Sequence, residues 1–256
     1  MEMNEQKKQI EDRMALIKNK VIILSNKGGV GKSTTTAILA SYLNQKGYKV
    51  GLLDIDLHGP SQAKLFGLEN KKILGDESGN LIPLEINSSF KIVTVAGLID
   101  PEKAAIWRGP FKANLIMQFL STIKWGELDY LLIDSPPGTG DEPLTAVQSI
   151  PELKALIVTT AQEMALIDTK KAISFLRELN VQILGLIQNM ATAVCPHCEK
   201  EMDLFGIKSD KLNVGVSDMT NIPFIRSLFI AAEKGLIFEA VKNNKELNKY
   251  LEKISL

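Results

Sequence analysis

Short apolar runs alternate along the chain with longer segments of mixed polarity. Each run is almost continuously apolar, which is typical of strands that are buried on both faces of a parallel sheet. Polar or turn-forming residues bound the runs, as expected for strands that end at loops. The runs that predict strands are Val21–Ser25, Val50–Asp54, Lys91–Val95, Tyr130–Asp134, Ala155–Thr159 and Ile183–Gln188.

The segments between these runs have the apolar spacing of amphipathic helices. Gly47 follows the first of them, Pro110 and Pro143 precede two others, and Asn180 follows the last. Such residues are common at helix boundaries, because proline suits a first turn and glycine or asparagine suits the residue after the end. The predicted helices are Lys32–Gln45, Phe111–Ile123, Leu144–Ser149 and Leu166–Leu179.

The charged opening segment, residues 1–19, is expected to form a further helix with Ile10, Met14 and Ile17 on one face. Together these elements predict an α/β fold, a doubly wound and mostly parallel sheet with right-handed crossovers and helices on both faces. The sequence contains no internal repeat, low-complexity tract or clear linker, so we expect a single domain over residues 1–256.

Composition narrows the range of partners. The 256 residues carry 30 Lys plus Arg and 30 Asp plus Glu, a balance that argues against a dedicated nucleic-acid binder. No uncharged apolar run approaches the ~18 residues that cross a bilayer, and the start is charged rather than signal-like. We therefore expect a cytoplasmic protein with neither nucleic acid nor membrane as a partner. Cys195 and Cys198 are the only cysteines, so a structural disulfide framework is not expected.

A glycine-rich segment lies directly after the first predicted strand and before the helix that begins at Lys32, which predicts a phosphate-binding loop. The glycines let backbone N–H groups surround phosphate oxygens, Lys32 adds a cation at the β and γ phosphates, and the Ser33 hydroxyl can ligate Mg²⁺. Asn26 stands where the strict pattern has glycine, and asparagine tolerates a left-handed conformation better than most residues. The predicted nucleotide-binding residues are Asn26, Lys27, Gly28, Gly29, Val30, Gly31, Lys32, Ser33 and Thr34.

Lys27, immediately before two glycines, resembles the signature lysine of the deviant Walker A motif in the MinD, ParA and nitrogenase-iron-protein ATPases. In that class the lysine reaches the nucleotide of a partner subunit, so the resemblance implies an ATP-sandwich homodimer. A cation supplied by a second chain would neutralise charge on the transferred phosphoryl group, as an arginine finger does. Lys27 is therefore predicted to be catalytic, with a solvated loop lysine as the alternative.

Acidic residues end two of the predicted strands, and ligands in open α/β sheets bind outside the carboxyl ends of strands. Asp134 is predicted to be the Walker B aspartate that holds Mg²⁺, with the glycine-rich segment 135–140 after it as switch II. By resemblance to the same ATPases, Asp56 would be a catalytic residue that orients or activates the attacking water. Asp54 would support the Mg²⁺ shell. Both could instead be strand-end or capping residues.

Two further polar elements have competing interpretations. Asp141 and Glu142 could extend the switch, but an acidic helix cap with Pro143 at the first helical position explains them better. Asn189 follows the last predicted strand, where this ATPase class recognises the adenine edge, and a side-chain amide can both donate and accept there. A turn asparagine is the alternative.

Cys195 and Cys198 form a Cys-Pro-His-Cys element, which we expect on an exposed loop within residues 190–206. Two thiolates are half of a tetrahedral metal site. The rest of the chain has no cysteine and one other histidine, His58, so a four-thiolate site cannot be completed within one chain. If the two-fold axis that Lys27 implies brought two such pairs together, they would supply four ligands for one bridging 4Fe-4S cluster.

Six stretches occur together in this chain: Lys27–Thr34, Asp54–Ser61, Trp107–Pro110, Asp134–Glu142, Asn189–Met190 and Cys195–Cys198. In this combination the chain resembles the Mrp-type (ApbC-like) carrier ATPases of iron–sulfur cluster assembly, and it departs from their pattern at Asn26, where glycine is usual. The resemblance implies a homodimeric P-loop NTPase that binds ATP and Mg²⁺ and hydrolyses ATP slowly. It also implies that the dimer holds a bridging 4Fe-4S cluster and transfers it to apo-proteins.

Three alternatives stay open. Zinc would satisfy the same four thiolates. Cys-Pro-His-Cys also occurs as a disulfide-exchange dithiol, although that motif normally opens a helix early in a thioredoxin fold. A MinD- or ParA-like positioning ATPase would act on membrane or DNA and could place amphipathic C-terminal helices on lipid, whereas packing on the core is the plainer use for them. The residues concerned are Ile237, Val241, Leu247, Tyr250, Leu251 and Ile254.

Overall fold

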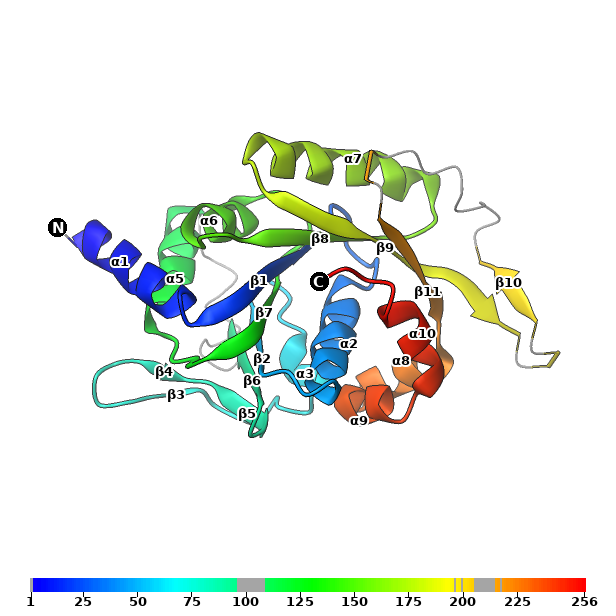
Figure 1. The fold of residues 1–256 in the computed structure, drawn as a ribbon, viewed down its shortest axis with the longest axis horizontal. Helices are drawn as coiled ribbons and strands as arrows, with labels where there is room; N and C mark the ends of the chain where they lie inside the picture. The colour runs from blue at the N-terminus through cyan, green and yellow to red at the C-terminus, as the bar shows by residue number, and fades with distance from the viewer. Residues whose placement is uncertain (1, 96–108, 196, 199, 205–214, 217) are drawn as a thin grey trace.

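A nine-stranded sheet forms the middle layer of the protein (Figure 1). The computed structural model describes residues 2–95, 109–195, 197–198, 200–204, 215–216 and 218–256. The strands lie in the order β10-β9-β8-β1-β7-β2-β6-β5, and β11 also pairs with β9. β10 and β5 run antiparallel to their neighbours, whereas the other pairs are parallel. The strands are β1 (Ile17–Leu24), β2 (Val50–Asp54), β5 (Leu84–Asn87), β6 (Phe90–Thr94), β7 (Leu128–Asp134), β8 (Lys154–Thr159), β9 (Gln182–Val194), β10 (Glu201–Asp203) and β11 (Met219–Phe224).

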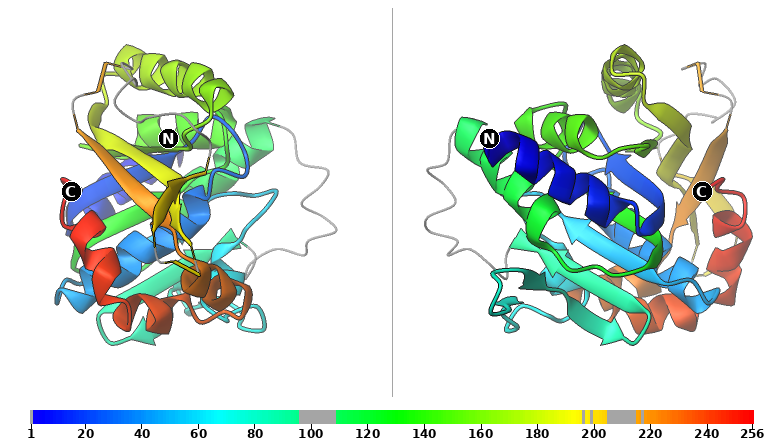
Figure 2. Two further views of the ribbon diagram at one scale, coloured as in Figure 1. Left: turned by 90° about the vertical axis from the view of Figure 1, so that its right-hand side faces the viewer. Right: turned by 60° about the vertical axis from the view of Figure 1, so that its left-hand side comes forward.

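Helices cover both faces of this sheet, as the two further views in Figure 2 show. One face carries α1 (Glu2–Met14), α5 (Gly109–Thr122), α6 (Asp141–Ser149) and α7 (Glu163–Glu178). The other carries α2 (Lys32–Gln45), α3 (Gln62–Leu65), α8 (Arg226–Glu233), α9 (Ile237–Lys242) and α10 (Lys245–Leu251). A small antiparallel pair, β3 (Leu74–Gly75) and β4 (Leu81–Ile82), forms a separate sheet. The predicted doubly wound fold is therefore confirmed.

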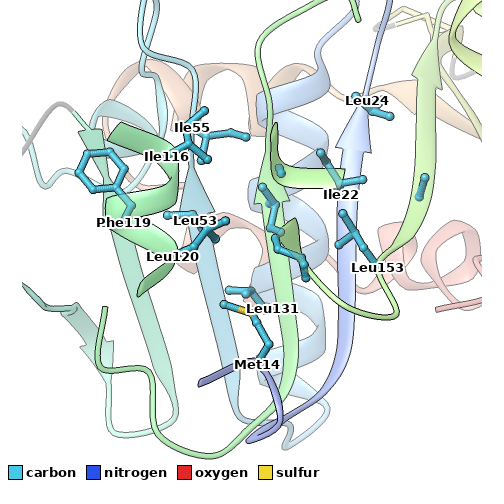
Figure 3. Close-up of a cluster of buried hydrophobic side chains, with 14 of the residues drawn as sticks. Met14, Ile22, Leu24, Leu53, Ile55, Ile116, Phe119, Leu120, Leu131 and Leu153 are labelled. Carbon is cyan, nitrogen blue, oxygen red and sulfur yellow. The ribbon is translucent and has the colours of Figure 1, made fainter. Parts of the chain in front are cut away.

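Alternate residues of the central strands feed two separate cores. Ile22 and Leu24 of β1 pack under the α5 face, where Figure 3 shows Phe119 and Leu120 of α5 near Leu53. The intervening strand residues, such as Val21 and Ile23 of β1, pack on the opposite face against α2. Burying each such side chain stabilises the fold by about 1.5–3 kcal/mol, so both cores stabilise the central strands.

The C-terminal apolar residues belong to the second core. Ile237, Val241, Leu247 and Leu251 are each at most 2% exposed and pack in the cluster that contains α2. Packing on the core, rather than presentation to lipid, is what the structure shows for these side chains. Among the described residues, no helix combines the length and apolar character that a membrane span requires.

Three boundaries differ most from the sequence-based expectation. α1 ends at Met14 and β1 begins at Ile17, so the opening helix is shorter than predicted and Ile17 is a strand residue. The polar residues 18–20 interrupt the apolar run, so the sequence pattern did not indicate a strand there. In the structure, Lys18 forms an ion pair with Asp129 of the neighbouring β7 at 2.8 Å. β9 extends to Val194, well beyond the predicted end at Gln188. Pairing with β10 and β11, which local sequence does not reveal, explains the extension.

Candidate nucleotide site and cysteine hairpin

The predicted phosphate loop connects β1 to α2 at the carboxyl ends of the central strands. Gly29 has φ +80°, and Gly31, the residue that caps α2, has φ +80° and ψ 24°. Most other residues would cost about 1–2 kcal/mol in this left-handed conformation, so glycine is strongly favoured at both positions. The loop surrounds a cavity of about 260 Å³ together with Asp56 and Pro137. Its side of the cavity consists of Ser25, Lys27, Gly28, Gly29, Val30, Gly31, Lys32, Ser33 and Thr34.

Asn26 does not need the left-handed conformation that its position suggested. Among the described non-glycine residues, positive φ angles occur at Glu152, Asn180 and Met190, and Asn26 is not one of them. Its side chain instead lies beside α7, where Nδ2 donates to Asp168 Oδ1 at 3.4 Å. The loop therefore accommodates asparagine in place of the usual glycine without backbone strain.

Lys32 and Asp134 form a buried ion pair beneath the loop. The side chains are 6% and 0% exposed, so neither charge can be balanced by solvent. Gln62, the first residue of α3, donates from Nε2 to Asp134 Oδ2 at 2.7 Å and to the Ser33 carbonyl at 3.0 Å. Sequence reasoning missed Gln62, although it directly follows the Gly-Pro-Ser stretch that helped to carry the family resemblance.

Asp54 lies opposite Asp134 in the register of β2 and β7 and is fully buried. Its carboxylate accepts hydrogen bonds from the backbone N–H groups of Asp56 at 3.1 Å and Gln62 at 3.2 Å, and from Thr94 Oγ1 at 3.1 Å. Burial first, and the neighbouring Asp134 second, raise the pKa of Asp54 to about 8.

These two carboxyl groups fit a Mg²⁺ ion that is shared with a nucleotide. A cation between Asp54 and Asp134 would relieve the repulsion that raises the Asp54 pKa. Gln62 Oε1 is buried there without a hydrogen-bond partner, which leaves an acceptor for an ion's water. Mg²⁺ usually takes one or two carboxylates and completes its shell with waters and substrate phosphates. No group of three or more His, Cys, Asp or Glu side chains in the described residues forms a metal site alone.

Asp56 lies at the edge of the phosphate cavity, in the loop that follows β2. Its Oδ1 accepts hydrogen bonds from the backbone N–H groups of His58 at 3.2 Å and Gly59 at 3.0 Å. The carboxylate is 9% exposed, so its orientation is set by its own loop. The structure thus brings Asp56 and the phosphate loop to one cavity, and its catalytic role stays a prediction.

Lys27 occupies the outer rim of the same cavity. The side chain is exposed, and Nζ donates to Gln162 Oε1 at 3.1 Å, just before α7. The predicted switch segment is tied to the same region, because Gly138 N donates to the Ser25 carbonyl at 2.7 Å. The predicted action of Lys27 on a second chain stays a prediction.

A second cavity of about 240 Å³ continues from Gly29 and Gly31 toward α8. Asn189 lies on its wall and donates from Nδ2 to the Val30 carbonyl at 2.9 Å. Met190, next to it, has φ +54°, an unusual conformation for a methionine in a strand. Apolar side chains line much of the cavity: Ile38, Leu65, Ile222, Phe224, Leu228 and Phe229.

Asp141 and Glu142 do not cap α6 as predicted. The helix begins at Asp141, its N-cap is Gly140 without a side-chain hydrogen bond, and Pro143 is its third residue. Glu142 points inward, with a side chain that is 7% exposed, and forms an ion pair with Lys112 of α5 at 2.8 Å. Tertiary packing, which local sequence does not report, overrides the capping preference here.

The cysteine element lies at the turn between β9 and β10, which pair as an antiparallel hairpin at the end of the sheet (Figure 1). Cys195 N donates to the Lys200 carbonyl at 3.0 Å, which closes the turn. Cys198 is exposed and Cys195 is partly exposed. Backbone hydrogen bonds from His197 and Cys198 lower the pKa of the Cys195 thiol. Pro196 and Glu199 lie outside the described residues.

Comparison with known protein families shows to which family the chain belongs. A family model described as NUBPL iron-transfer P-loop NTPase (ParA) matches residues 16–255. The chain belongs to this family. Within it, the "Iron-sulfur cluster carrier protein" of Methanocaldococcus jannaschii is 43% identical, covering 98% of this chain and 88% of the relative. The "Cytosolic Fe-S cluster assembly factor CFD1" of Saccharomyces cerevisiae is 43% identical, covering 83% of this chain and 74% of the relative.

Solved structures share the fold of this chain. A nucleotide-binding protein of Archaeoglobus fulgidus in complex with ADP is 37% identical, with a TM-score of 0.79 and coverage of 91% of this chain and 93% of that one. MinD of Pyrococcus horikoshii, complexed with Mg-ADP, has a TM-score of 0.71 over 93% and 94% of the two chains. Its 23% identity shows the fold alone.

Trp107 and Arg108, which helped to carry the family resemblance, lie outside the described residues.

Proposed function

We propose that this chain is an ATP-hydrolysing iron–sulfur cluster carrier that works as a homodimer and delivers its cluster to apo-proteins. One observation carries the proposal. The chain assembles a nucleotide cavity from its own residues, whereas it presents two thiols on an exposed hairpin, half of what a cluster requires. The names of the M. jannaschii and S. cerevisiae relatives support the same cargo.

ATP would bind with its phosphates in the 260 Å³ cavity. The loop N–H groups and the start of α2 favour the phosphate charge, and Lys32 exchanges part of its pairing with Asp134 for phosphate oxygens. Ser33, Asp54 and Asp134 would hold Mg²⁺, which neutralises phosphate charge when it is bound. The apolar cavity beside Asn189 suits the adenine ring, with the Asn189 amide at its edge.

Hydrolysis requires a positioned water and a stabilised phosphoryl group. Asp56 at the cavity edge would orient the water, because its carboxylate is already fixed by two backbone N–H groups. Lys27 would leave Gln162 and enter the cavity of the partner protomer, where its ammonium stabilises the developing charge. Catalysis would then depend on the dimer, and a separated chain would hydrolyse slowly.

The cluster would be bound between two hairpins, with Cys195 and Cys198 contributed by each protomer. The exposure of the turn suits a labile cargo, because a recipient's cysteines can approach it. The lowered pKa of the Cys195 thiol favours the thiolate, the form that ligates iron. The word "Cytosolic" in the yeast relative's name supports a cytosolic location for this carrier.

Two alternative functions have less support. A thioredoxin-like dithiol would open a helix, whereas Cys195 closes a β-hairpin. A membrane-positioning ATPase would need free apolar C-terminal residues, whereas Ile237 and Leu247 are fully buried. Zinc remains the competing occupant of the four thiolates, because it accepts the same ligands.

A transfer assay tests the proposal. The protein is reconstituted anaerobically with iron and sulfide and mixed with an apo-enzyme whose activity requires a 4Fe-4S cluster. We expect broad absorbance at about 400 nm and recovery of the recipient's activity. The Cys198→Ser variant, prepared in the same way, should give neither. A colourless, zinc-loaded dimer that activates no recipient would contradict the proposal.

A further inference from the structure

A bridge of three side chains joins the two loops that flank the phosphate cavity. His58 belongs to the loop after β2, Lys112 to α5, and Glu142 to α6, immediately after the 135–140 segment. Lys112 Nζ donates to His58 Nε2 at 2.6 Å and pairs with Glu142 Oε1 at 2.8 Å. His58 Nε2 lies 4.0 Å from the same Glu142 oxygen.

The Lys112–Glu142 ion pair of this bridge is largely shielded from solvent. The Glu142 and Lys112 side chains are 7% and 15% exposed, whereas the outer His58 ring is 52% exposed. Burying two charges costs more free energy than a surface pair, and such pairs are a poor source of stability compared with apolar packing. A pair of this kind is better explained by the geometry that it fixes.

That geometry leads directly to Asp56. The same His58 residue that contacts Lys112 through its ring donates its backbone N–H to Asp56 Oδ1 at 3.2 Å. An ammonium group can only donate, so His58 Nε2 is the acceptor in this contact. The orientation of the Asp56 carboxylate is therefore coupled, through one residue, to the start of α6.

We propose that Lys112 and Glu142 are positioning residues for ATP hydrolysis. They fix the position of the Asp56 loop relative to the switch segment 135–140. Asp56 and the phosphate loop then act on the same phosphoryl group. The residues act through His58 and do not touch the nucleotide. This inference rests on the proposed function, because it assigns part of the hydrolytic machinery of that site.

The test is a set of matched variants assayed for steady-state ATP hydrolysis. Lys112→Met removes the bridging cation, Lys112→Arg restores one, and Glu142→Gln removes the anion. Lys46→Met, which breaks the exposed pair with Glu252, is the control. We expect Lys112→Met and Glu142→Gln to lower kcat by about tenfold with KM for ATP changed less than about twofold, because a displaced Asp56 affects the transition state more than binding. Lys112→Arg should recover most of kcat, and Lys46→Met should match the wild type.

Hydrogen exchange of the peptide that covers residues 55–62 gives a second readout that needs no turnover. We expect faster exchange in nucleotide-free Lys112→Met than in the wild type or Lys46→Met, because the bridge no longer restrains the Asp56 loop. Unchanged kcat and unchanged exchange in a folded Lys112→Met protein would overturn the inference. A parallel loss of nucleotide affinity and melting temperature, without recovery in Lys112→Arg, would also overturn it and indicate a structural role.

The wild type separates this inference from the proposed function. If the wild type does not hydrolyse ATP even when reconstituted with a cluster, the proposed function fails. If it hydrolyses ATP and the variants behave as it does, only the positioning role fails.

Discussion

The nucleotide cavity and the cysteine hairpin have opposite designs. At the base of the cavity, ionisable groups are buried and have partners: Lys32 pairs with Asp134, and Asp54 accepts hydrogen bonds from backbone N–H groups. At the hairpin, Cys195 and Cys198 are partly or fully exposed, and no third ligand joins them among the described residues. One site has its binding groups within a single chain, and the other does not.

The two sites would therefore need a second chain to different extents. Nucleotide binding requires preorganised dipoles and cations, which the loop and α2 supply locally. A four-thiolate cluster needs four thiols, so the proposed cluster would bind only when two chains meet. If the rim lysine Lys27 also acts across that contact, ATP and cluster would influence each other through the same dimer, with reciprocal effects on affinity.

The largest expected effect is at the hairpin. Cys195→Ser should abolish bound iron and sulfide, because each dimer loses two of its four ligands. Binding of a fluorescent ADP analogue should stay within about twofold of the wild type, since the hairpin contributes nothing to the phosphate cavity. Iron and sulfide analysis alongside nucleotide titration measures both. Retained iron in Cys195→Ser would break the contrast.

A large loss of turnover is expected for Lys27→Ala. The exposed side chain contributes little to its own chain, so ADP affinity should be nearly unchanged. Hydrolysis should fall by about 10²-fold or more, as when an arginine finger is removed. Phosphate release and nucleotide titration separate the two effects, with Gln162→Ala as a control for loss of the resting contact. Normal hydrolysis by Lys27→Ala would show that catalysis is complete within one chain.

A smaller effect concerns the stability of the metal-free protein. The folded-state pKa of Asp54, about 8, lies above its unfolded value of 3.8. Folding therefore takes up a proton between these values, and the free energy of unfolding falls as pH rises through that window. Denaturant unfolding in EDTA should show a decrease on the order of 1–3 kcal/mol between pH 5 and 8. Asp54→Asn should remove much of this slope. Addition of Mg-ADP should also flatten it.

The smallest expected effect is at the apolar cavity beside Asn189. Asn189→Ala removes one amide at the wall of the cavity and its hydrogen bond to the Val30 carbonyl. Loss of about 0.5–1.5 kcal/mol should weaken ATP binding by roughly 2- to 13-fold. Competition of ATP with GTP should also become less selective, because an amide edge is what distinguishes the two bases. Unchanged affinity and selectivity would place the base elsewhere.

Much of the nucleotide cavity could be predicted from sequence because its signals are local. The strand, glycine loop and helix are contiguous, and α2 has the predicted bounds Lys32–Gln45. Asp54 and Asp134 could be placed together because parallel strands end at one edge of the sheet. The structure confirms both placements, and neither prediction needed knowledge of contacts between distant segments.

The rest depends on contacts between distant segments. β9 continues past Gln188 because β10 and β11 pair with it, and neither partner has a strong strand pattern of its own. Gln62 gains its role only when α3 approaches Asp134. Glu142 was expected to cap α6, but the approach of Lys112 on α5 draws it inward. Single-sequence patterns carry no signal for such pairings.

The most direct test of the central claim is the iron, sulfide and oligomeric state of the anaerobically reconstituted protein, measured together by chemical analysis and sedimentation. The account predicts a dimer that contains about four iron and four sulfide per two chains, and a monomer when the Cys195→Ser protein is treated in the same way without nucleotide. A monomer that carries a complete cluster on its own would contradict the account.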